Sequence, residues 1–396
     1  MQKRKIGIHA AGFIGWGGGI DFLRMIIRSI LATKKYEVVI LLPDHLSFRD
    51  RVRRSLSHFS LTANKKNNAP RQFSDHRNLF KEFSQEAKSV TYKKSLKKAV
   101  KQHRIDLLIP CIEAVNPDID IPWVGYIYDF QHEYLTQFFT PEEIKHRQVQ
   151  FGNTVHTAKN VIVNSYAVKK DIEKFYPDST AKVTNLPFTP LFNRQLLSSD
   201  FTEIKQRYAL PDKYFIISNQ FWIHKSHITA FRALHILHSI SNDRIAIVCT
   251  GDTGDSRRAD YFDSLKKEIR DLGIEDNVFF LGYISKPDQI QLLLHSVALI
   301  QPTLFEGGPG GGATYDAIAF SKPAIISDID INKEINDPLV TFFQVNNHAD
   351  LADKMKTVLE QHKSSHWKLD VNKLEEETAQ RISILGDVLS ALIDSI

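Results

Sequence analysis

Cysteine and long apolar runs are what this sequence most lacks. Only two cysteines, Cys111 and Cys249, occur among its 396 residues, and both lie in apolar stretches typical of strands. So sparse a pair provides neither a disulfide framework nor a metal cluster, and we expect two small buried side chains in a reducing cytoplasm. No stretch approaches the ~20 apolar residues that cross a bilayer, and the N-terminus lacks a signal-peptide core. These absences predict a soluble or peripheral protein.

The composition is that of an ordinary globular chain. Hydrophobic residues make up 42% of the sequence and charged residues 24%, which argues against a disordered or fibrous protein. A chain of this length can bury two separate cores, so we expect two domains.

The positive charge is concentrated in one segment. The net charge is only +5, but residues 49–104 contain about 16 Lys and Arg against about 4 Asp and Glu. Such a segment could contact nucleic acid, anionic lipid or a phosphorylated acceptor, or could simply form solvated helix faces in an insertion. No RNA-binding signature, zinc finger or basic zipper accompanies it, so we expect no nucleic-acid partner. The other readings stay open.

Short apolar runs alternate with helix-length segments along the whole chain. The first half has five of them, at residues 5–10, 37–42, 106–110, 123–128 and 160–164. The second half has five more, at residues 214–217, 244–249, 278–281, 297–300 and 324–326. Runs of this kind suit parallel strands buried on both faces, and their alternation with helices indicates βαβ units. We predict an α/β protein with two open sheets of about five strands each.

Prolines mark the join between the two halves. Pro187, Pro190 and Pro211 punctuate a polar stretch between residues 186 and 212. We therefore predict an N-terminal domain at residues 1–190 and a C-terminal domain at residues 191–375. The apolar spacing from residue 373 to residue 396 suits an amphipathic helix, and we expect residues 376–396 to pack back on the N-terminal domain.

Two loops of the first half follow strands, where open α/β sheets bind ligands. Gly17 and Gly18 belong to a glycine-rich loop that enters a helix at about Asp21, so backbone amides there could approach a phosphate or sugar. The spacing is not the dinucleotide fingerprint, and a plain turn stays an alternative. After a later strand come Asp129 and His132, whose carboxylate and imidazole could orient an acceptor hydroxyl or take its proton.

Two further loops follow strands of the second half. Asn219, Gln220 and Lys225 lie between a strand and a helix, and a lysine there could neutralise a departing diphosphate. The other loop carries Glu306, a glycine run and then a helix that we expect Thr314 to cap. Amides at such a helix start bind phosphate, here those of Gly311, Gly312 and Ala313, and Glu306 could accept hydrogen bonds from sugar hydroxyls.

Together these loops resemble the retaining glycosyltransferases of family 4. The resemblance covers nearly the whole chain and is strongest at residues 280–283 (Phe-Leu-Gly-Tyr), 301–308 (Gln-Pro-Thr-Leu-Phe-Glu-Gly-Gly) and 327–334 (Ser-Asp-Ile-Asp-Ile-Asn-Lys-Glu). The N-terminal glycine loop, the Asp129–His132 pair and Asn164-Ser165 carry it more weakly. The resemblance implies the GT-B fold, with two Rossmann-like domains that face each other across a cleft. It also implies that residues 1–190 bind the acceptor and that residues 191–375 bind the nucleotide sugar.

The resemblance also implies roles for single residues. Glu306 would be the first glutamate of the family's Glu-x7-Glu motif and contact the donor sugar, with residues 307–314 around the diphosphate. Lys225 would be the family's diphosphate lysine. Gly17 and Gly18 would reach the donor phosphate or the acceptor from the opposite domain. The implied reaction is transfer of a sugar from a nucleoside diphosphate to an acceptor hydroxyl, with retention at the anomeric carbon.

The sequence departs from the family pattern at three positions. Gln220 stands where the family has an arginine, about five residues before the lysine, and Tyr128 stands where many members have histidine. Thr314 stands at the second glutamate, so that Asp316 is the nearest acid able to hold a ribose diol. We interpret these as marks of a subgroup, with a catalytically inactive nucleotide-sugar-binding protein as the main alternative and a nucleotide-sugar epimerase as a more distant one.

Metal ions and cofactors are not expected. The Asp-Ile-Asp triplets at residues 118–120 and 328–330 imitate the motif of metal-dependent transferases, but a helix terminus and Lys225 would make an ion unnecessary. The expected partners are a nucleotide-sugar donor and a saccharide or lipid-linked acceptor, with peripheral membrane contact through the basic segment. This combination predicts a role in cell-envelope polysaccharide or glycoconjugate synthesis at the cytoplasmic face of the membrane.

Overall fold

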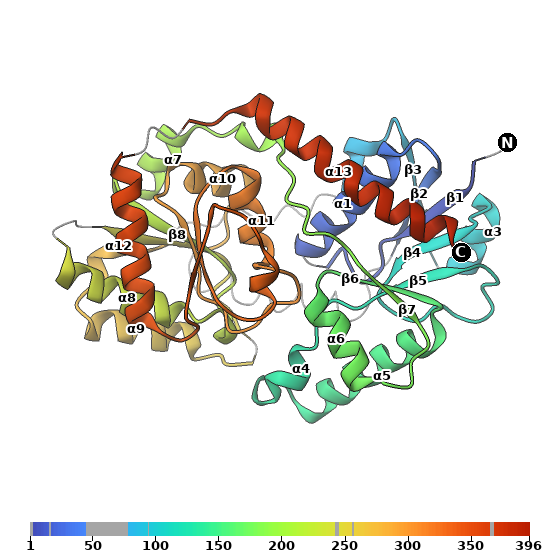
Figure 1. Cartoon of the computed structure of the whole chain (residues 1–396), viewed down its shortest axis with the longest axis horizontal. Helices are drawn as coiled ribbons and strands as arrows, with labels where there is room; N and C mark the ends of the chain where they lie inside the picture. Colours follow the sequence, from blue (N-terminus) through green and yellow to red (C-terminus); the bar gives the residue numbers. More distant parts are fainter. Residues whose placement is uncertain are drawn as a thin grey trace. The chain divides into compact units, whose positions relative to one another are not determined.

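A computed structural model describes most of the chain (Figure 1). The described residues are 3–15, 17–44, 78–93, 95–241, 245–255, 257–364 and 368–396. This set leaves out residues 45–77 and 94, which include much of the basic segment. It also leaves out Trp16 of the first glycine loop. Contacts divide the chain into two compact units, unit 1 (residues 1–189 with 379–396) and unit 2 (residues 190–378). The boundaries between the two units, after residues 189 and 378, lie close to the domain boundaries predicted from the sequence at residues 190 and 375.

Unit 1 is built on a seven-stranded sheet with the order β3-β2-β1-β4-β5-β6-β7, in which all neighbours pair in parallel. Its strands are β1 (Lys5–His9), β2 (Glu37–Pro43), β3 (Ala87–Tyr92), β4 (Leu107–Cys111), β5 (Trp123–Tyr126), β6 (Asn160–Val163) and β7 (Lys182–Asn185). Its helices are α1 (Gly17–Ala32), α3 (Leu96–His103), α4 (Gln131–Tyr134), α5 (Pro141–Thr157) and α6 (Tyr166–Phe175), together with most of α13 (Val371–Asp394).

Unit 2 is built on a six-stranded sheet with the order β10-β9-β8-β11-β12-β13, again all parallel. Its strands are β8 (Tyr214–Ser218), β9 (Ala246–Thr250), β10 (Val278–Phe280), β11 (Leu299–Gln301), β12 (Ala324–Ser327) and β13 (Val340–Phe343). Its helices are α7 (Phe201–Tyr208), α8 (His227–Ile240), α9 (Tyr261–Asp271), α10 (Lys286–His295), α11 (Gly311–Ala319) and α12 (His348–Ser364). The predicted α/β class is confirmed, whereas the predicted count of about five strands in each sheet is wrong.

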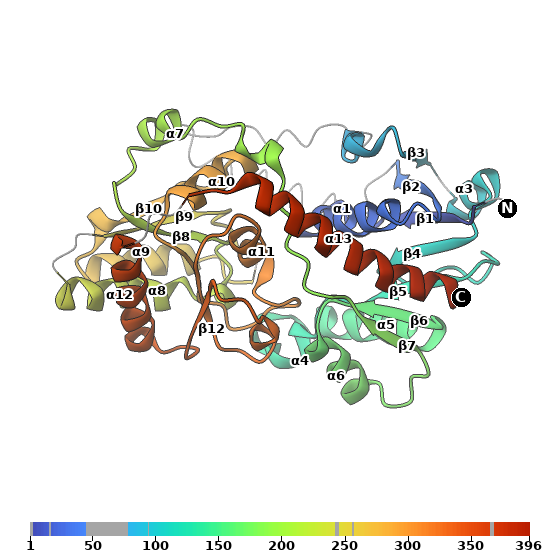
Figure 2. The same ribbon diagram turned by 45° about the horizontal axis from the view of Figure 1, so that its top comes forward.

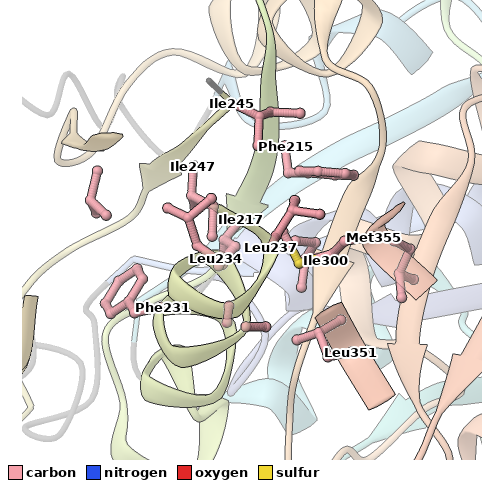
Figure 3. Packing of buried hydrophobic residues seen from close by; sticks show 14 of the residues in the cluster. Phe215, Ile217, Phe231, Leu234, Leu237, Ile245, Ile247, Ile300, Leu351 and Met355 are labelled. Carbon is pink, nitrogen blue, oxygen red and sulfur yellow. The ribbon is translucent and has the colours of Figure 1, made fainter. Parts of the chain in front are cut away.

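The core of unit 2 explains why its central strands are apolar throughout. Side chains from β8 and β9 meet those of α8 and α12, as Phe215, Leu234 and Met355 show in Figure 3. A parallel strand that is covered by helices on both faces buries all of its side chains, so its apolar residues form a continuous run instead of alternating with polar ones. Both cysteines lie in such strands as free, buried thiols, and burial raises the pKa of each.

The C-terminal half of α13 belongs to the core of unit 1. It lies beside α1 in Figures 1 and 2, and the two helices approach closely at Gly386, where a Cβ atom would lie 2.8 Å from the carbonyl oxygen of Ser29. Arg4 donates to the carbonyl oxygen of Ile393 (2.5 Å), and Tyr36 donates to the Asp394 carboxylate (2.6 Å). No helix in the described part of the chain is both long enough and apolar enough to span a bilayer.

Candidate functional site

An ion pair joins two loops at the carboxyl edge of the unit 2 sheet. Lys225 ends the short 3-10 helix η6 (Ile223–Lys225) that follows β8, and Glu306 follows β11, the neighbour of β8 in the sheet. Lys225 Nζ lies 2.5 Å from Glu306 Oε1, and the two side chains are only 11% and 9% exposed. The structure thus brings together the two residues for which the sequence predicts diphosphate and sugar contacts.

The two oxygens of Glu306 have different surroundings. Oε1 accepts from Lys225 and also from Gln301 Nε2 at 2.9 Å, while Gln301 Oε1 accepts from Asn219 Nδ2 at 2.5 Å. Oε2 receives no hydrogen bond from any residue that the structure describes. It lies against Gly311, where a Cβ atom would be 2.8 Å away, so glycine is what lets the carboxylate reach the start of α11.

Helix α11 begins at a pair of glycines with left-handed backbone. Gly310 is the N-cap (φ +69°) and Gly311 the first helical residue (φ +64°). The amide of Gly310 donates to Asn332 Oδ1 at 2.8 Å, and the amide of Gly311 donates to the carbonyl oxygen of Gly308 at 3.1 Å. A Cβ atom on Gly312 would meet nothing within 4 Å, so this turn of the helix is open to a ligand. Of the three predicted phosphate-binding amides, that of Gly311 is already used within the loop.

Thr314 does not cap the helix, contrary to the prediction. It is fully buried in the second turn of α11, and its hydroxyl donates back to the carbonyl oxygen of Gly310 at 2.7 Å. Threonine hydroxyls inside a helix commonly bond the carbonyl four residues earlier, which satisfies the hydroxyl without involving the helix start. The cap is therefore provided by the backbone of Gly310 and the side chain of Asn332.

Asp316 pairs with the neighbouring helix. Its carboxylate forms an ion pair with Lys286, the first residue of α10, and lies 3.5 Å from Gln289 Nε2. This contact ties α11 to α10, so a ribose bound by Asp316 would have to share the carboxylate with Lys286. The ribose role stays a prediction.

The loops after β8 and β9 hold each other in place. Gln220, which stands where the family has an arginine, accepts a hydrogen bond from the backbone amide of Asp252 through Oε1 at 3.2 Å. Asp255, a side chain only 1% exposed, accepts from the amide of Ile223 at 3.0 Å and pairs with Arg257 at 2.9 Å. The Gly-Asp-Thr-Gly-Asp run at residues 251–255, directly after a strand, is a sequence signal that would have pointed to Asp255. Nothing in the sequence indicated that Gln301 and Asn332 bond to the site.

Asp129 and His132 lie in different surroundings in unit 1. Asp129 Oδ1 accepts from the amide of Gln131 and from Arg147, both at 3.0 Å, and its side chain is 20% exposed. His132 is fully buried against Phe130 and Phe151, and burial, followed by the nearby charge of Arg147, lowers its pKa. No ring atom faces solvent in this structure, and the proton-accepting role of His132 stays a prediction.

Helix α1 begins at Gly17, four residues earlier than expected. Gly17 and Gly18 are both exposed, and a Cβ atom on Gly17 would meet nothing within 4 Å. The glycines therefore form the first turn of the helix itself rather than a preceding loop, and their backbone is accessible to a ligand.

Comparison with protein families shows what unit 2 is similar to. Residues 200–370 match the family described as glycosyl transferases group 1. The matched region is a little under half of the chain. It contains Lys225, Glu306 and the start of α11, whereas Gly17, Gly18, Asp129 and His132 lie outside the matched region. No curated protein matches the sequence at a significant level.

Solved glycosyltransferases share the fold of the whole chain, including the part outside residues 200–370. HepE from Anabaena, solved with UDP and glucose, is 13% identical with a TM-score of 0.63, covering 99% of this chain and 100% of HepE. A glycosyltransferase from Rickettsia africae is 14% identical (TM-score 0.63; 99% and 97% covered). Sucrose-phosphate synthase from Thermosynechococcus elongatus is 12% identical (TM-score 0.62; 100% of both chains). The predicted GT-B fold class is confirmed by this likeness, while membership of family 4 in particular stays a prediction.

The metal-like triplets of the sequence have other contacts in the structure. Asp328 Oδ1 accepts from the amide of Val345 at 2.8 Å, and Asp118 lies on the surface, 3.7 Å from Lys97. Among the described residues no group of three potential metal ligands comes together.

Proposed function

We propose that this protein transfers a sugar from a nucleoside-diphosphate sugar to an acceptor hydroxyl. The observation that carries the proposal is the little-exposed Lys225–Glu306 pair beside the open start of α11, within the region that matches the group 1 glycosyl transferases. A cation, a carboxylate and a helix N-terminus are the three groups that a diphosphate joined to a sugar requires. HepE was solved with UDP and glucose, which makes uridine diphosphate sugars the first donors to test.

In the proposed reaction the protein acts mainly through charge. The bond between the anomeric carbon and the diphosphate oxygen breaks, and a bond from the acceptor oxygen forms on the same face of the sugar. The acceptor proton passes to the departing phosphate oxygen. Lys225 and the amides at the start of α11 stabilise the negative charge that develops on the diphosphate. Glu306 Oε2 accepts a hydrogen bond from a sugar hydroxyl and so orients the ring.

Retention and independence from metal ions belong to the proposal and have direct tests. The anomeric configuration of the product, measured by NMR on the first turnovers, should equal that of the donor. Activity should survive EDTA and show no gain with Mg²⁺ or Mn²⁺. An inverted product would overturn the proposed same-face mechanism.

A screen of nucleoside diphosphates and their sugars tests the function itself. A ligand that binds only the native state raises the melting temperature, by an amount that corresponds to ~2.7 kcal/mol at a hundredfold excess over Kd. We expect at least one nucleoside diphosphate to raise the melting temperature and its sugar conjugate to be slowly hydrolysed. If no member of the panel shifts the melting temperature, the proposal fails.

The second candidate function is a binding protein that does not catalyse transfer. Two observations favour it: Gln220 provides no positive charge and bonds Asp252 instead, and Thr314 is buried where a second glutamate is expected. Nucleotide sugars would then raise the melting temperature without hydrolysis or transfer of any donor. Measurable turnover of one donor would reject this candidate.

For the acceptor, we propose a saccharide or a lipid-linked pyrophosphate in cell-envelope polysaccharide assembly, reached at the cytoplasmic face of a membrane. The support is the basic segment at residues 49–104, much of which lies outside the described residues. The protein should co-sediment with liposomes that contain anionic lipid, and less so at high salt. If the fraction of protein that sediments with liposomes depends on neither the lipid charge nor the salt concentration, the proposed membrane contact is contradicted.

A further inference from the structure

We infer that Gln301 is a positioning residue which, together with Asn219, holds Glu306 ready for the donor sugar. The inference rests on the proposed function but concerns Gln301, a residue to which the sequence analysis assigned no role. It also reassigns Asn219, for which the sequence predicted direct contact with the donor. The feature that carries it is a chain of three side chains at the carboxyl ends of β8 and β11.

Gln301 is the last residue of β11 and is completely buried. Its amide has an acceptor at one end and a donor at the other. Asn219, just beyond β8, donates to the oxygen end at 2.5 Å, so the nitrogen end must face Glu306, to which it donates at 2.9 Å. Asn219 thereby fixes which way the Gln301 amide points, and Gln301 in turn fixes one oxygen of Glu306.

This arrangement matters because Lys225 alone cannot hold Glu306 through the reaction. In the proposed mechanism the diphosphate attracts the Lys225 ammonium, which weakens its bond to Glu306 Oε1. Gln301 is neutral and buried, so the arrival of a diphosphate does not draw it away. Glu306 therefore keeps Oε1 bound to the protein and Oε2 beside Gly311, where no described residue donates to it.

One variant removes the Gln301 donor while keeping nearly the length of the side chain. Gln301→Met has no hydrogen-bonding nitrogen, so it cannot donate to Glu306. The matched control is Gln291→Met on α10, because Gln291 is also a buried glutamine of unit 2 (8% exposed) and its amide donates to the carbonyl oxygen of Leu197, outside the site.

The measurements separate positioning from mere stability. We expect the UDP-induced shift in melting temperature to be unchanged in Gln301→Met, while kcat with the best nucleotide sugar falls roughly 10- to 100-fold, the scale of losing a hydrogen bond to a charged group. Gln291→Met should keep both values. Normal kcat in Gln301→Met, or a loss of UDP binding that matches the loss of kcat, would overturn the inference.

Crystal structures without nucleotide provide a second test that needs no donor, provided that Lys225 is removed as well. In Lys225→Met, Gln301 should keep the Glu306 carboxylate beside Gly311, whereas in Lys225→Met combined with Gln301→Met the carboxylate should turn away. A carboxylate that stays in place in the double variant would overturn the inference. If the wild-type protein bound no nucleoside diphosphate, the proposed function would fail, yet these structures would still show whether Gln301 positions Glu306.

Discussion

At the scale of single residues, Lys225 and Glu306 depend on each other's charge. The two side chains are only 11% and 9% exposed, so removing one of them leaves the other as a poorly solvated charge. Such a loss lowers the free energy of unfolding by ~3–5 kcal/mol in fully buried pairs, and by less in this pair. We expect Lys225→Ala to lower turnover by ~10²–10³ and to destabilise the fold. Lys225→Ala combined with Glu306→Gln should regain stability but not turnover, as measured by kcat and by denaturant unfolding.

Lys266→Ala is the control for this prediction. Lys266 pairs with Asp263 on the exposed surface of α9, where the side chains are 44% and 76% exposed. Such pairs contribute little, so both stability and turnover should stay near wild type. Near-normal turnover in Lys225→Ala itself would reject the proposed role of the lysine.

Two neighbouring glycines of α11 offer a matched comparison. Gly311 has a φ of +64°, and a Cβ atom there would lie 2.8 Å from Glu306 Oε2, whereas a Cβ atom on Gly312 meets nothing within 4 Å. Gly311→Ala should therefore cost ~1–3 kcal/mol in unfolding free energy and abolish most activity. Gly312→Ala should be neutral or gain up to ~1 kcal/mol, because alanine favours a helix. Equal stability of the two variants in urea unfolding would contradict this account.

His227 makes the fold sensitive to acid. It is fully buried, stacks on Phe221 and has no hydrogen-bond partner for either ring nitrogen among the described residues. Burial, and secondarily the charge of Lys225, lowers its pKa from 6.5 to about 3. Between pH 6.5 and pH 3 the imidazole takes up a proton in the unfolded chain but not in the folded protein. The free energy of unfolding therefore keeps its full value above pH 6.5, as far as His227 is concerned, and decreases as the pH falls towards 3.

His227→Phe tests this directly because phenylalanine keeps the stacking and cannot be protonated. Between pH 7.5 and pH 5 the wild type should lose ~2 kcal/mol more than the variant, from a pKa difference that operates over about 1.5 pH units. Unfolding free energies from urea titrations at the two pH values provide the measurement. Parallel losses in the two proteins would show that His227 does not bind the proton on unfolding.

At the scale of elements, the strands that the sequence failed to predict lie at the edges of the sheets. β3 and β7 flank the first sheet and β13 flanks one side of the second. β3 reads Ala-Lys-Ser-Val-Thr-Tyr, and three of its six residues are exposed; the residues of β7 and β13 are mostly half-buried. An edge strand covered on one side needs no continuous apolar run, so the pattern that revealed the central strands was absent.

The loops of the site could be located from the sequence, but their internal contacts could not. Strand ends and glycine runs placed Lys225 and Glu306 correctly at one sheet edge, because parallel strands share that edge. The side chain that bonds to the N-cap of α11 is that of Asn332, and only the fold brings Asn332 near Gly310. Thr314 looked like a cap in the sequence because it is a good capping residue near the end of a glycine run.

The close approach of α1 and α13 leads to a prediction about helix packing. A Cβ atom on Gly386 would lie 2.8 Å from the Ser29 carbonyl oxygen, so Gly386→Ala should push the helices apart and cost ~1–3 kcal/mol despite better helix propensity. Gly152→Ala in α5 is the control, since its Cβ atom would make only an ordinary 3.4 Å contact with Tyr176. The control should be neutral or stabilising in thermal unfolding, and a Gly386→Ala variant that behaves the same way would disprove the tight contact.

At the scale of the whole molecule, the last residues of the sequence complete the first unit. Residues 379–396 bury Leu385, Leu389 and Ile393 against unit 1. Deleting residues 379–396 should speed hydrogen exchange in β1 and β2 while leaving exchange in β8 and β11 close to wild type. The nucleoside-diphosphate shift expected for unit 2 should persist in the shortened protein. Equal loss of protection in both sheets would mean that the units do not fold separately.

The return of α13 to unit 1 also determines the order in which the protein can be completed during translation. Unit 2 is one continuous stretch, so all of its residues are synthesised before residues 379–396 are added. Unit 1 begins first, yet its core is complete only after the later turns of α13 have been made. A stop codon at position 379 would therefore release a complete unit 2 attached to an incomplete unit 1.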